Sequence, residues 1–226
     1  MKILLFDIDG TLIHSGGSGL HGMNLAFADT WGIANALQGL QLSGRTDSLI
    51  LQDALDRHQL TGNAELVEHF KSRYFVHLAA DMKHPRPARR LMPGFPEVLE
   101  HLQRKDGIHI GLLTGNWIKS AEIKLAYFDL WKYFEFGAFA DDESDRNQLV
   151  PHAIRRAQEK FDITVARDRV YVIGDTPRDI ECARPHAAVA VAVATGEYSA
   201  EELRAHAPDY LFRDFSEVEA VLRILE

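Results

Sequence analysis

The feature that most constrains the fold is a short apolar segment, Ile3–Phe6, followed at once by the sequence Asp-Ile-Asp-Gly at positions 7–10. A brief apolar run that ends in a turn signal is typical of a buried β-strand. Asp7 and Asp9 would therefore lie beyond the carboxyl end of that strand, where open α/β sheets bind ligands. Two carboxylates at such a place repel each other, so they need a cation, a shared proton or different protonation states. Asp-Gly is also a common turn dipeptide, and for this pair alone that simpler interpretation stays open.

Strand-like segments recur along the chain and alternate with helical patterns. The segments predicted to be strands are Ile3–Phe6, Ile108–Thr114, Phe136–Ala140, Val170–Gly174, Val189–Ala194 and Tyr210–Phe212. Apolar residues at helical spacing cover Pro96–Lys105, Ser120–Tyr127 and Asn147–Phe161. This alternation predicts an α/β fold with a doubly wound parallel sheet and right-handed crossovers.

The segment between His14 and Leu91 breaks this rhythm, because it contains only helical patterns, over Leu20–Trp31, Asp47–His58 and Asn63–Ala80. A connection of this length is expected to form a small helical domain. We therefore predict a core domain of residues 1–14 and 92–226 and an inserted all-helical cap domain of residues 15–91. The Gly-rich segment 15–19 and the Pro-containing segment 84–87 are interpreted as hinges that would let the cap close over a site. The basic run 83–90 is interpreted as solvated.

Composition excludes several classes of protein. The net charge is −8, which argues against general binding to nucleic acid or to an anionic membrane surface. The single cysteine, Cys182, cannot form an internal disulfide and is expected to be a buried apolar residue. The apolar stretch Ala187–Ala194 is too short to span a bilayer, and the N-terminal apolar run is too short for a secretion signal. We expect a cytoplasmic protein; its oligomeric state stays open.

Two other predicted strands end in polar residues. Thr114 and Gly115 follow one strand and precede a helix, so a hydroxyl and free N–H groups would form an anion site there, unless Thr114 is only a helix cap. Asp175 and Asp179 follow another strand, where the alternative is one capping and one solvated aspartate. Three strand ends with carboxylates or an anion cradle are hard to explain by capping alone. Together they predict one site at the carboxyl edge of the sheet.

These segments resemble the signatures of the haloacid dehalogenase-like hydrolases. Phe6–Leu12 is similar to the first signature, Leu113–Asn116 to the second and Ile173–Asp179 to the fourth. Their order and the helical insertion after the first signature are similar too. The chain looks most like the phosphoglycolate-phosphatase-like branch, which has a Rossmann-like core and an inserted helical cap.

The resemblance implies a role for each acid. Asp7 would attack phosphorus and form an aspartyl-phosphate. Asp9 would protonate the leaving alkoxide and then act as base on water, which calls for a raised pKa. Mg²⁺ would be held by Asp7, by the backbone carbonyl of Asp9 and by Asp175, and Asp179 would orient its neighbours.

The resemblance also implies a phosphate cradle made by Thr114 and Gly115, with a lysine from a third signature. In the corresponding segment, residues 141–147, the only cation is Arg146, which we expect to take that place. The alternative is that Arg146 only offsets the neighbouring acids on a solvated loop.

Three residues near the predicted cap are candidates for substrate specificity. Arg45 and Thr46 lie in a segment that resembles the loop with which family members reach into the active site, and Arg45 would meet a second anionic group of the substrate. A surface Arg45 before a capping Thr46 is the alternative. His14 follows the first signature closely enough to face the substrate, although a hinge position explains it equally well.

These observations predict a Mg²⁺-dependent phosphatase of small phosphorylated metabolites, similar to phosphoglycolate, that works through an aspartyl-phosphate. Asp9 favours this activity over dehalogenation, because a halide leaving group needs no proton. A phosphomutase on the same scaffold and a non-catalytic binding or regulatory protein remain alternatives.

Overall fold

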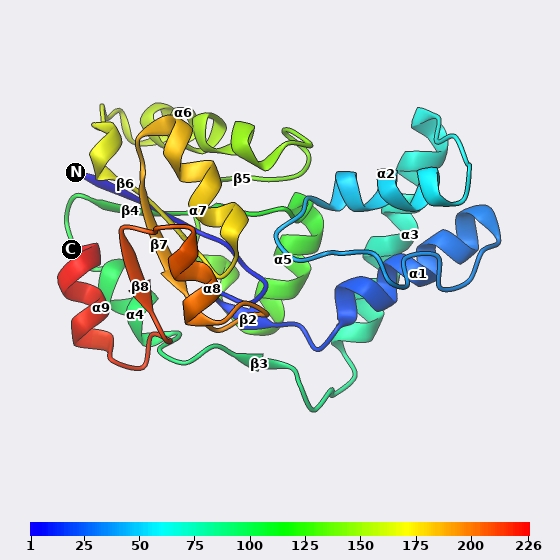
Figure 1. Ribbon diagram of the computed structural model, residues 1–226, viewed down its shortest axis with the longest axis horizontal. Coiled ribbons are helices and arrows are strands. Elements are labelled where there is room, and N and C mark those ends of the chain that lie inside the picture. The colour runs from blue at the N-terminus through cyan, green and yellow to red at the C-terminus, as the bar shows by residue number, and fades with distance from the viewer.

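The computed structural model describes residues 1–226 and is built around a six-stranded, all-parallel sheet (Figure 1). The strand order is β5-β4-β1-β6-β7-β8. The strands are β1 Lys2–Phe6, β4 Ile108–Leu113, β5 Gly137–Ala138, β6 Val170–Gly174, β7 Val189–Val193 and β8 Tyr210–Phe212. The predicted doubly wound parallel sheet is thus confirmed.

Strand β1 lies inside the sheet and is buried along its whole length. Leu4 and Phe6 belong to the hydrophobic cluster on one face of the sheet, and Ile3 and Leu5 belong to the cluster on the other. This division follows from the two-residue period of a strand. A strand with both faces covered is apolar throughout, which is why β1 reads as an unbroken apolar run.

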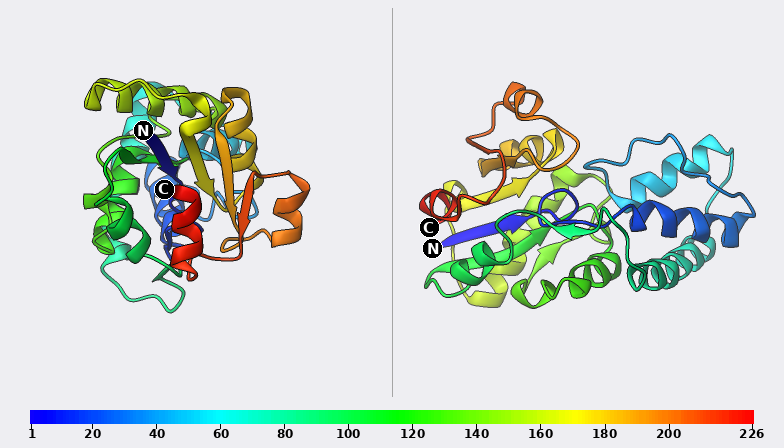
Figure 2. Two further views of the ribbon diagram at one scale, coloured as in Figure 1. Left: turned by 90° about the vertical axis from the view of Figure 1, so that its left-hand side faces the viewer. Right: turned by 90° about the horizontal axis from the view of Figure 1, so that it is seen from below.

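Helices cover both faces of the sheet (Figure 2). The cluster that contains Phe6 takes residues from α4, α5 and α9, and the cluster that contains Leu5 takes residues from α6, α7 and α8. The bounds are α4 Glu97–Leu102, α5 Ile118–Tyr127, α6 Leu149–Phe161, α7 Pro177–Ala183, α8 Ala200–Ala205 and α9 Val218–Leu225. No helix of the chain combines the length and the apolar character that crossing a bilayer requires.

Three further helices form an insert between β2 (Ile13–His14) and β3 (Arg90–Leu91). They are α1 Ser18–Trp31, α2 Asp47–Arg57 and α3 Ala64–Met82, and we call them the helical insert. Figure 2 shows the helical insert beyond the carboxyl ends of the strands. It has its own hydrophobic cluster, around Phe27 and Phe70, which also takes in Trp117 of the core. We propose that this insert is the predicted cap domain.

The two connections to the helical insert contain a short pair of strands that the sequence did not predict. β2 and β3 pair in antiparallel register, Ile13 with Leu91 and His14 with Arg90, so the expectation of no strand near these positions is wrong. We propose that this short ribbon marks the boundary between the core and the cap.

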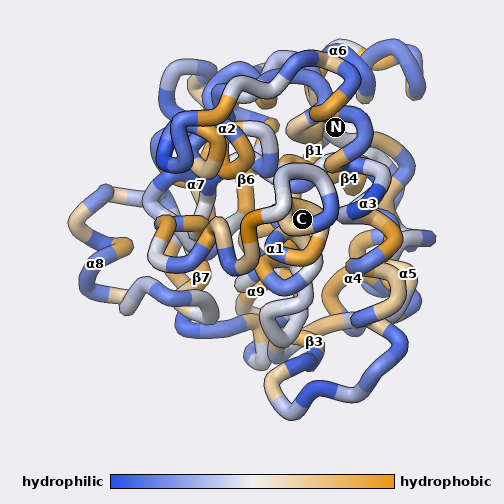
Figure 3. The backbone as a smooth tube through the Cα atoms, turned by 90° about the vertical axis from the view of Figure 1, so that its right-hand side faces the viewer, coloured by the Kyte–Doolittle hydropathy of each residue, from blue (hydrophilic) through white to orange (hydrophobic).

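The basic run before β3 is not simply solvated, although Figure 3 shows it mostly in hydrophilic colours. The Arg89 side chain is 1% exposed and forms an ion pair with Asp81. It also donates to the carbonyls of Ser15 and Met82, at 3.2 and 2.8 Å, and to the hydroxyl of Ser18 at 2.7 Å. These acceptors lie at the end of α3 and the start of α1, so Arg89 fastens the two connections to each other. The interpretation of this segment as a solvated hinge is therefore wrong at Arg89.

Candidate active site

The polar strand ends meet because of the strand order. β1 lies between β4 and β6, so the residues that follow these three strands are neighbours at the carboxyl edge of the sheet. Asp7 follows β1, Thr114 follows β4 and Asp175 follows β6. The structure brings these ends together around a polar cavity of about 450 Å³ between the core and the helical insert.

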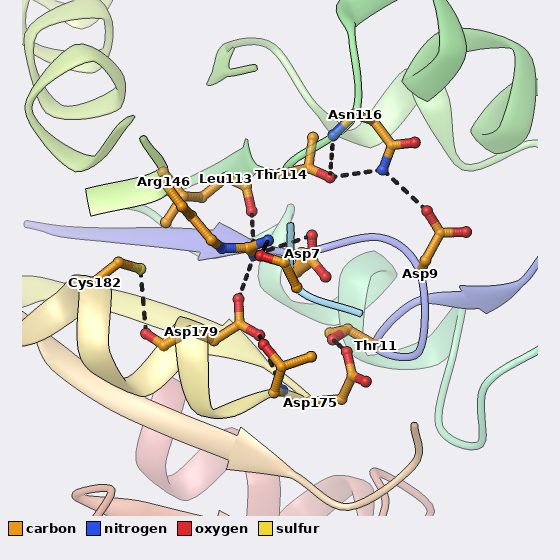
Figure 4. Close-up of polar contacts among 12 residues, drawn as sticks. Asp7, Asp9, Thr11, Leu113, Thr114, Asn116, Arg146, Asp175, Asp179 and Cys182 are labelled. Carbon is orange, nitrogen blue, oxygen red and sulfur yellow. Dashed lines mark hydrogen bonds and ion pairs between the residues drawn. The ribbon is translucent and has the colours of Figure 1, made fainter. Parts of the chain in front are cut away.

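Asp7, Asp175 and Asp179 form a compact group of acids (Figure 4). One carboxylate oxygen from each lies within 4.8 Å of the others, and all three residues are buried. Asp175 accepts a hydrogen bond from the hydroxyl of Thr11 at 3.0 Å. It sits so close to Gly10, which has φ +87°, that a Cβ there would lie 2.3 Å from its Oδ2. Glycine at position 10 is therefore required for this packing.

Burial raises the pKa of Asp7 to about 6 and raises the pKa of Asp175 well above its ordinary value, and the neighbouring acids add to both shifts. The negative charges of Asp7 and Asp175 are thus poorly compensated by the positive groups of the protein alone. A group of buried carboxylate oxygens is the kind of ligand set that Mg²⁺ prefers. The residues present therefore fit a divalent cation at this place.

Arg146 supplies a cation to this group. It lies in the 3₁₀ turn Arg146–Gln148 before α6, and its side chain is 7% exposed. Its Nη2 lies 3.2 Å from Oδ1 of Asp7 and also contacts Asp179. Arg146 lines the cavity, so it is not on a solvated loop. The charges of Asp179 and Asp7 raise the pKa of the Arg146 guanidinium despite its burial.

Both carboxylate oxygens of Asp179 already have partners within the protein. One carboxylate oxygen pairs with Arg146, and the other accepts from the backbone N–H and the hydroxyl of Thr176, at 3.0 and 2.7 Å. Thr176 and Asp179 form a capping box at the start of α7. Asp179 therefore caps α7 and pairs with Arg146 at the same time.

Asp9 lies apart from this group (Figure 4). Its Oδ2 accepts a hydrogen bond from Lys124 Nζ at 2.6 Å and from Asn116 Nδ2 at 3.0 Å. Burial opposes ionisation of Asp9, but the ammonium of Lys124 and these two hydrogen bonds outweigh it and lower its pKa. The expectation of a raised pKa at Asp9 is therefore wrong in this geometry, because a cation 115 residues away in sequence lies against it.

Lys124 is a site residue that the sequence did not predict. It lies on α5, its side chain is 5% exposed, and its Nζ also donates to Asn116 Oδ1 at 2.6 Å. Its neighbours on the helix, Ala121 and Leu125, are buried in the core. A lysine within the apolar face of a helix is unusual, and that signal would have pointed to a buried partner.

Thr114 and Gly115 are placed differently from each other. The Thr114 hydroxyl is buried and accepts from the backbone N–H and the side-chain amide of Asn116, at 3.3 and 2.8 Å. Gly115 and Asn116 line the cavity, whereas Thr114 does not. A Cβ at Gly115 would lie 2.1 Å from the carbonyl oxygen of Arg45, so the core here touches the loop of the helical insert directly.

The three specificity candidates also differ. His14 and Arg45 line the cavity. His14 Nδ1 accepts from the N–H of Gly16 at 3.1 Å, and Arg45 Nη1 pairs with Asp53 at 2.7 Å. Thr46 does not line the cavity. Its hydroxyl caps α2 and donates to the carbonyl of Ser144 at 2.7 Å, so it holds the loop against the core.

Asp47, next to Thr46, ties the helical insert to the core. Its backbone N–H donates to the Gly115 carbonyl at 2.7 Å. Its Oδ2 accepts from the N–H of Trp117 at 2.9 Å and from the hydroxyl of Ser120 at 3.0 Å. Burial raises the pKa of Asp47 to about 6, against opposing effects of Lys124 and these hydrogen bonds.

The raised pKa of Asp47 predicts a pH dependence of stability. A folded-state pKa of about 6, above the ordinary 3.8, means that the folded protein binds this proton more tightly. The contribution is present at low pH and is lost as pH rises through about 6. Relative to Asp47→Asn, the wild type should therefore gain about 1 kcal/mol of unfolding free energy between pH 7 and pH 5. Urea unfolding with a chelator present measures this, and equal pH slopes for the two proteins would contradict it.

The comparisons with known proteins agree with this architecture. Residues 1–186 match the family model for haloacid dehalogenase-like hydrolases. A phosphoglycolate phosphatase from Cereibacter sphaeroides is 27% identical over 136 residues, which are 60% of this chain and 61% of that protein. The chain thus spans about three fifths of the length of this curated relative.

Solved structures share the fold at low identity. A hydrolase from Pseudomonas syringae has a TM-score of 0.72 at 22% identity, with 100% of this chain and 99% of that chain covered. CbbY from Rhodobacter sphaeroides, solved in complex with phosphate, has a TM-score of 0.74 at 18% identity, with 96% of both chains covered. At such identities the likeness shows the fold alone.

Proposed function

The chain belongs to the haloacid dehalogenase-like hydrolase family, and on that premise we propose that it is a Mg²⁺-dependent phosphatase that acts through an aspartyl-phosphate. Its substrates would be small phosphorylated metabolites, with phosphoglycolate as the first to test, since a relative at 27% identity is a phosphoglycolate phosphatase. The observation that carries the proposal is the contact of Asp7 with Arg146, beside Asp175, in the wall of a polar cavity.

The chemistry of the site supports metal binding. Asp7, Asp175 and the backbone carbonyl of Asp9 would hold the Mg²⁺. The bound ion would supply positive charge that offsets repulsion between these carboxylates and the phosphoryl oxygens. Arg146 would share this task from the side of Asp179, because its planar guanidinium suits phosphoryl oxygens.

In the first step an Asp7 oxygen would form a bond to phosphorus while the bond between phosphorus and the ester oxygen breaks. The leaving alkoxide would take a proton from Asp9 and depart as an alcohol. Asp9 must be protonated for this step, and a phosphoryl dianion beside it would raise its lowered pKa. In the second step water would attack phosphorus and give its proton to Asp9, while the bond between phosphorus and the Asp7 oxygen breaks. This restores the Asp7 carboxylate and releases inorganic phosphate.

Metal removal provides the direct test. The purified protein should hydrolyse p-nitrophenyl phosphate with added Mg²⁺, and a chelator should lower the rate about 100-fold or more because the carboxylates are then uncompensated. Excess Mg²⁺ should restore the rate. Phosphate release that is unaffected by the chelator would contradict the proposed metal dependence.

A further inference from the structure

Two buried donors meet at one point of the cavity wall. Lys124 comes from α5 of the core, Tyr74 comes from α3 of the helical insert, and both line the cavity with Asp9. They converge on Gly19 of α1, where a Cβ would lie 3.4 Å from Lys124 Nζ and 3.7 Å from the Tyr74 hydroxyl oxygen. The lack of a side chain at Gly19 leaves this space open.

The ammonium of Lys124 is only partly satisfied. It has three N–H donors, and its hydrogen bonds go to Asp9 Oδ2 and Asn116 Oδ1, both at 2.6 Å. One donor therefore has no protein acceptor. Because the side chain is almost fully buried, bulk water does not readily provide one.

The hydroxyl of Tyr74 makes no hydrogen bond of standard geometry, although the Ser120 hydroxyl lies nearby. The residue is 0% exposed. Its ring packs with Phe70, Phe75 and Trp117, which explains the aromatic ring but not the hydroxyl. A phenylalanine would pack equally well, and a buried hydroxyl without a partner is costly. A ligand in the cavity that carries an oxygen acceptor would complete the hydrogen bonds of both donors.

The position of Asp9 indicates which part of the substrate would supply the acceptor oxygen. A general acid must come within about 2.6–3.2 Å of the leaving oxygen. Lys124 lies directly against Asp9, so atoms of the leaving group just beyond the ester oxygen would reach Lys124 and Tyr74. Asp47 belongs to the helical insert and lines the same cavity. Its Oδ2 already accepts hydrogen bonds from Trp117 and Ser120.

We propose that Lys124 and Tyr74 form a leaving-group subsite for an acceptor oxygen, of a hydroxyl or of a carboxylate, that is bonded to the carbon next to the ester carbon of the substrate. The proposal rests on the proposed phosphatase function. It assigns substrate selection to Lys124 on α5 and Tyr74 on α3, whereas the sequence predicted Arg45, Thr46 and His14 for that role.

Three phosphate esters test the subsite. In phosphoglycolate the carbon next to the ester carbon is the carboxylate carbon, in glycerol 1-phosphate that carbon carries a hydroxyl, and in ethyl phosphate it carries no oxygen. The wild type should show a kcat/KM at least about tenfold higher for one or both of the first two than for ethyl phosphate. The preferred ester identifies the acceptor as carboxylate or hydroxyl.

The sharpest variant is Tyr74→Phe, which removes only the unpartnered hydroxyl. It should lower the preference about 3- to 10-fold and leave the melting temperature unchanged or higher. Lys124→Met should lower the rate on all three esters, because Asp9 loses its partner, and should also lower the preference about tenfold or more. Tyr210→Phe is the matched control, because Tyr210 lies on strand β8 and outside the cavity. It should change neither the preference among the esters nor the melting temperature.

Two results would overturn the proposal. One is a wild type that hydrolyses p-nitrophenyl phosphate but has no preference among the three esters. The other is a preference that survives both Tyr74→Phe and Lys124→Met, which would leave Lys124 acting on Asp9 alone. In either case the proposed phosphatase function is unaffected. That function would instead be contradicted if the protein did not hydrolyse p-nitrophenyl phosphate, or hydrolysed it equally well without Asp7.

Discussion

Replacing Asp7 by asparagine is expected to lower kcat for p-nitrophenyl phosphate by about 10,000-fold or more. The amide has nearly the same shape as the carboxylate, but it lacks the charged oxygen that would attack phosphorus. Since burial raises the pKa of Asp7 to about 6, removing its charge should not weaken the metal-free fold. Phosphate release at saturating Mg²⁺, together with thermal unfolding of both proteins, measures this.

The same experiment separates four explanations. Acid quenching during turnover, followed by peptide mass spectrometry, should find a phosphoryl group on Asp7 of the wild type and none in Asp7→Asn. A binding or regulatory protein would show no turnover in either protein. Activity that a chelator abolishes but that survives in Asp7→Asn at the wild-type level would indicate a contaminating phosphatase. An intact, phosphorylated wild type without phosphate release would favour the mutase alternative.

Removing the guanidinium of Arg146 is expected to have the largest effect on stability. Arg146 is the cation that contacts Asp7 and Asp179, and all three residues are buried. Breaking a buried ion pair by removing one partner typically costs about 3–5 kcal/mol, because the remaining charges stay buried without compensation. We therefore expect Arg146→Met to lose about 3–5 kcal/mol of unfolding free energy in urea, measured with a chelator so that no bound metal masks the loss.

Arg146→Lys is the matched control. It keeps the charge but cannot contact Asp7, Asp179 and the Leu113 carbonyl with one planar group, as Arg146 does. Its stability should lie between those of the wild type and Arg146→Met. If Arg146→Met unfolds at the wild-type urea concentration, the ion pairs do not support the fold and the role assigned to Arg146 is wrong.

Much of the core was predictable from local pattern. Each inner strand of a parallel sheet that is covered on both faces must be a short apolar run, and β1, β6 and β7 stand out in the sequence for that reason. The edge strand β5, Gly137–Ala138, is shorter than the predicted segment Phe136–Ala140, because only two of its residues pair with β4. The paired strands β2 and β3 were not predicted, since a two-residue ribbon has no period to detect.

The site residues that could be predicted are those that come directly after a strand in the sequence. Asp7, Asp9 and Asp175 come directly after predicted strands, and parallel topology brings such ends together. Lys124 and Tyr74 lie in the middle of helices that pack against the site from elsewhere, so no local signal connects them to Asp9. The lowered pKa of Asp9 was missed for the same reason, because a pKa depends on charges close in space.

By itself the sequence determined the parallel α/β core, the helical insertion and the acids at the sheet edge, because periodicity and turn residues act over a few neighbouring positions. Only the tertiary structure decided which cation faces which carboxylate: Arg146 lies against Asp7 and Asp179, and Lys124 lies against Asp9. Electrostatic energies depend on distances of a few ångströms between segments far apart in the chain. Those distances are set by the packing of α5 and α6 on the sheet and of the helical insert on the core.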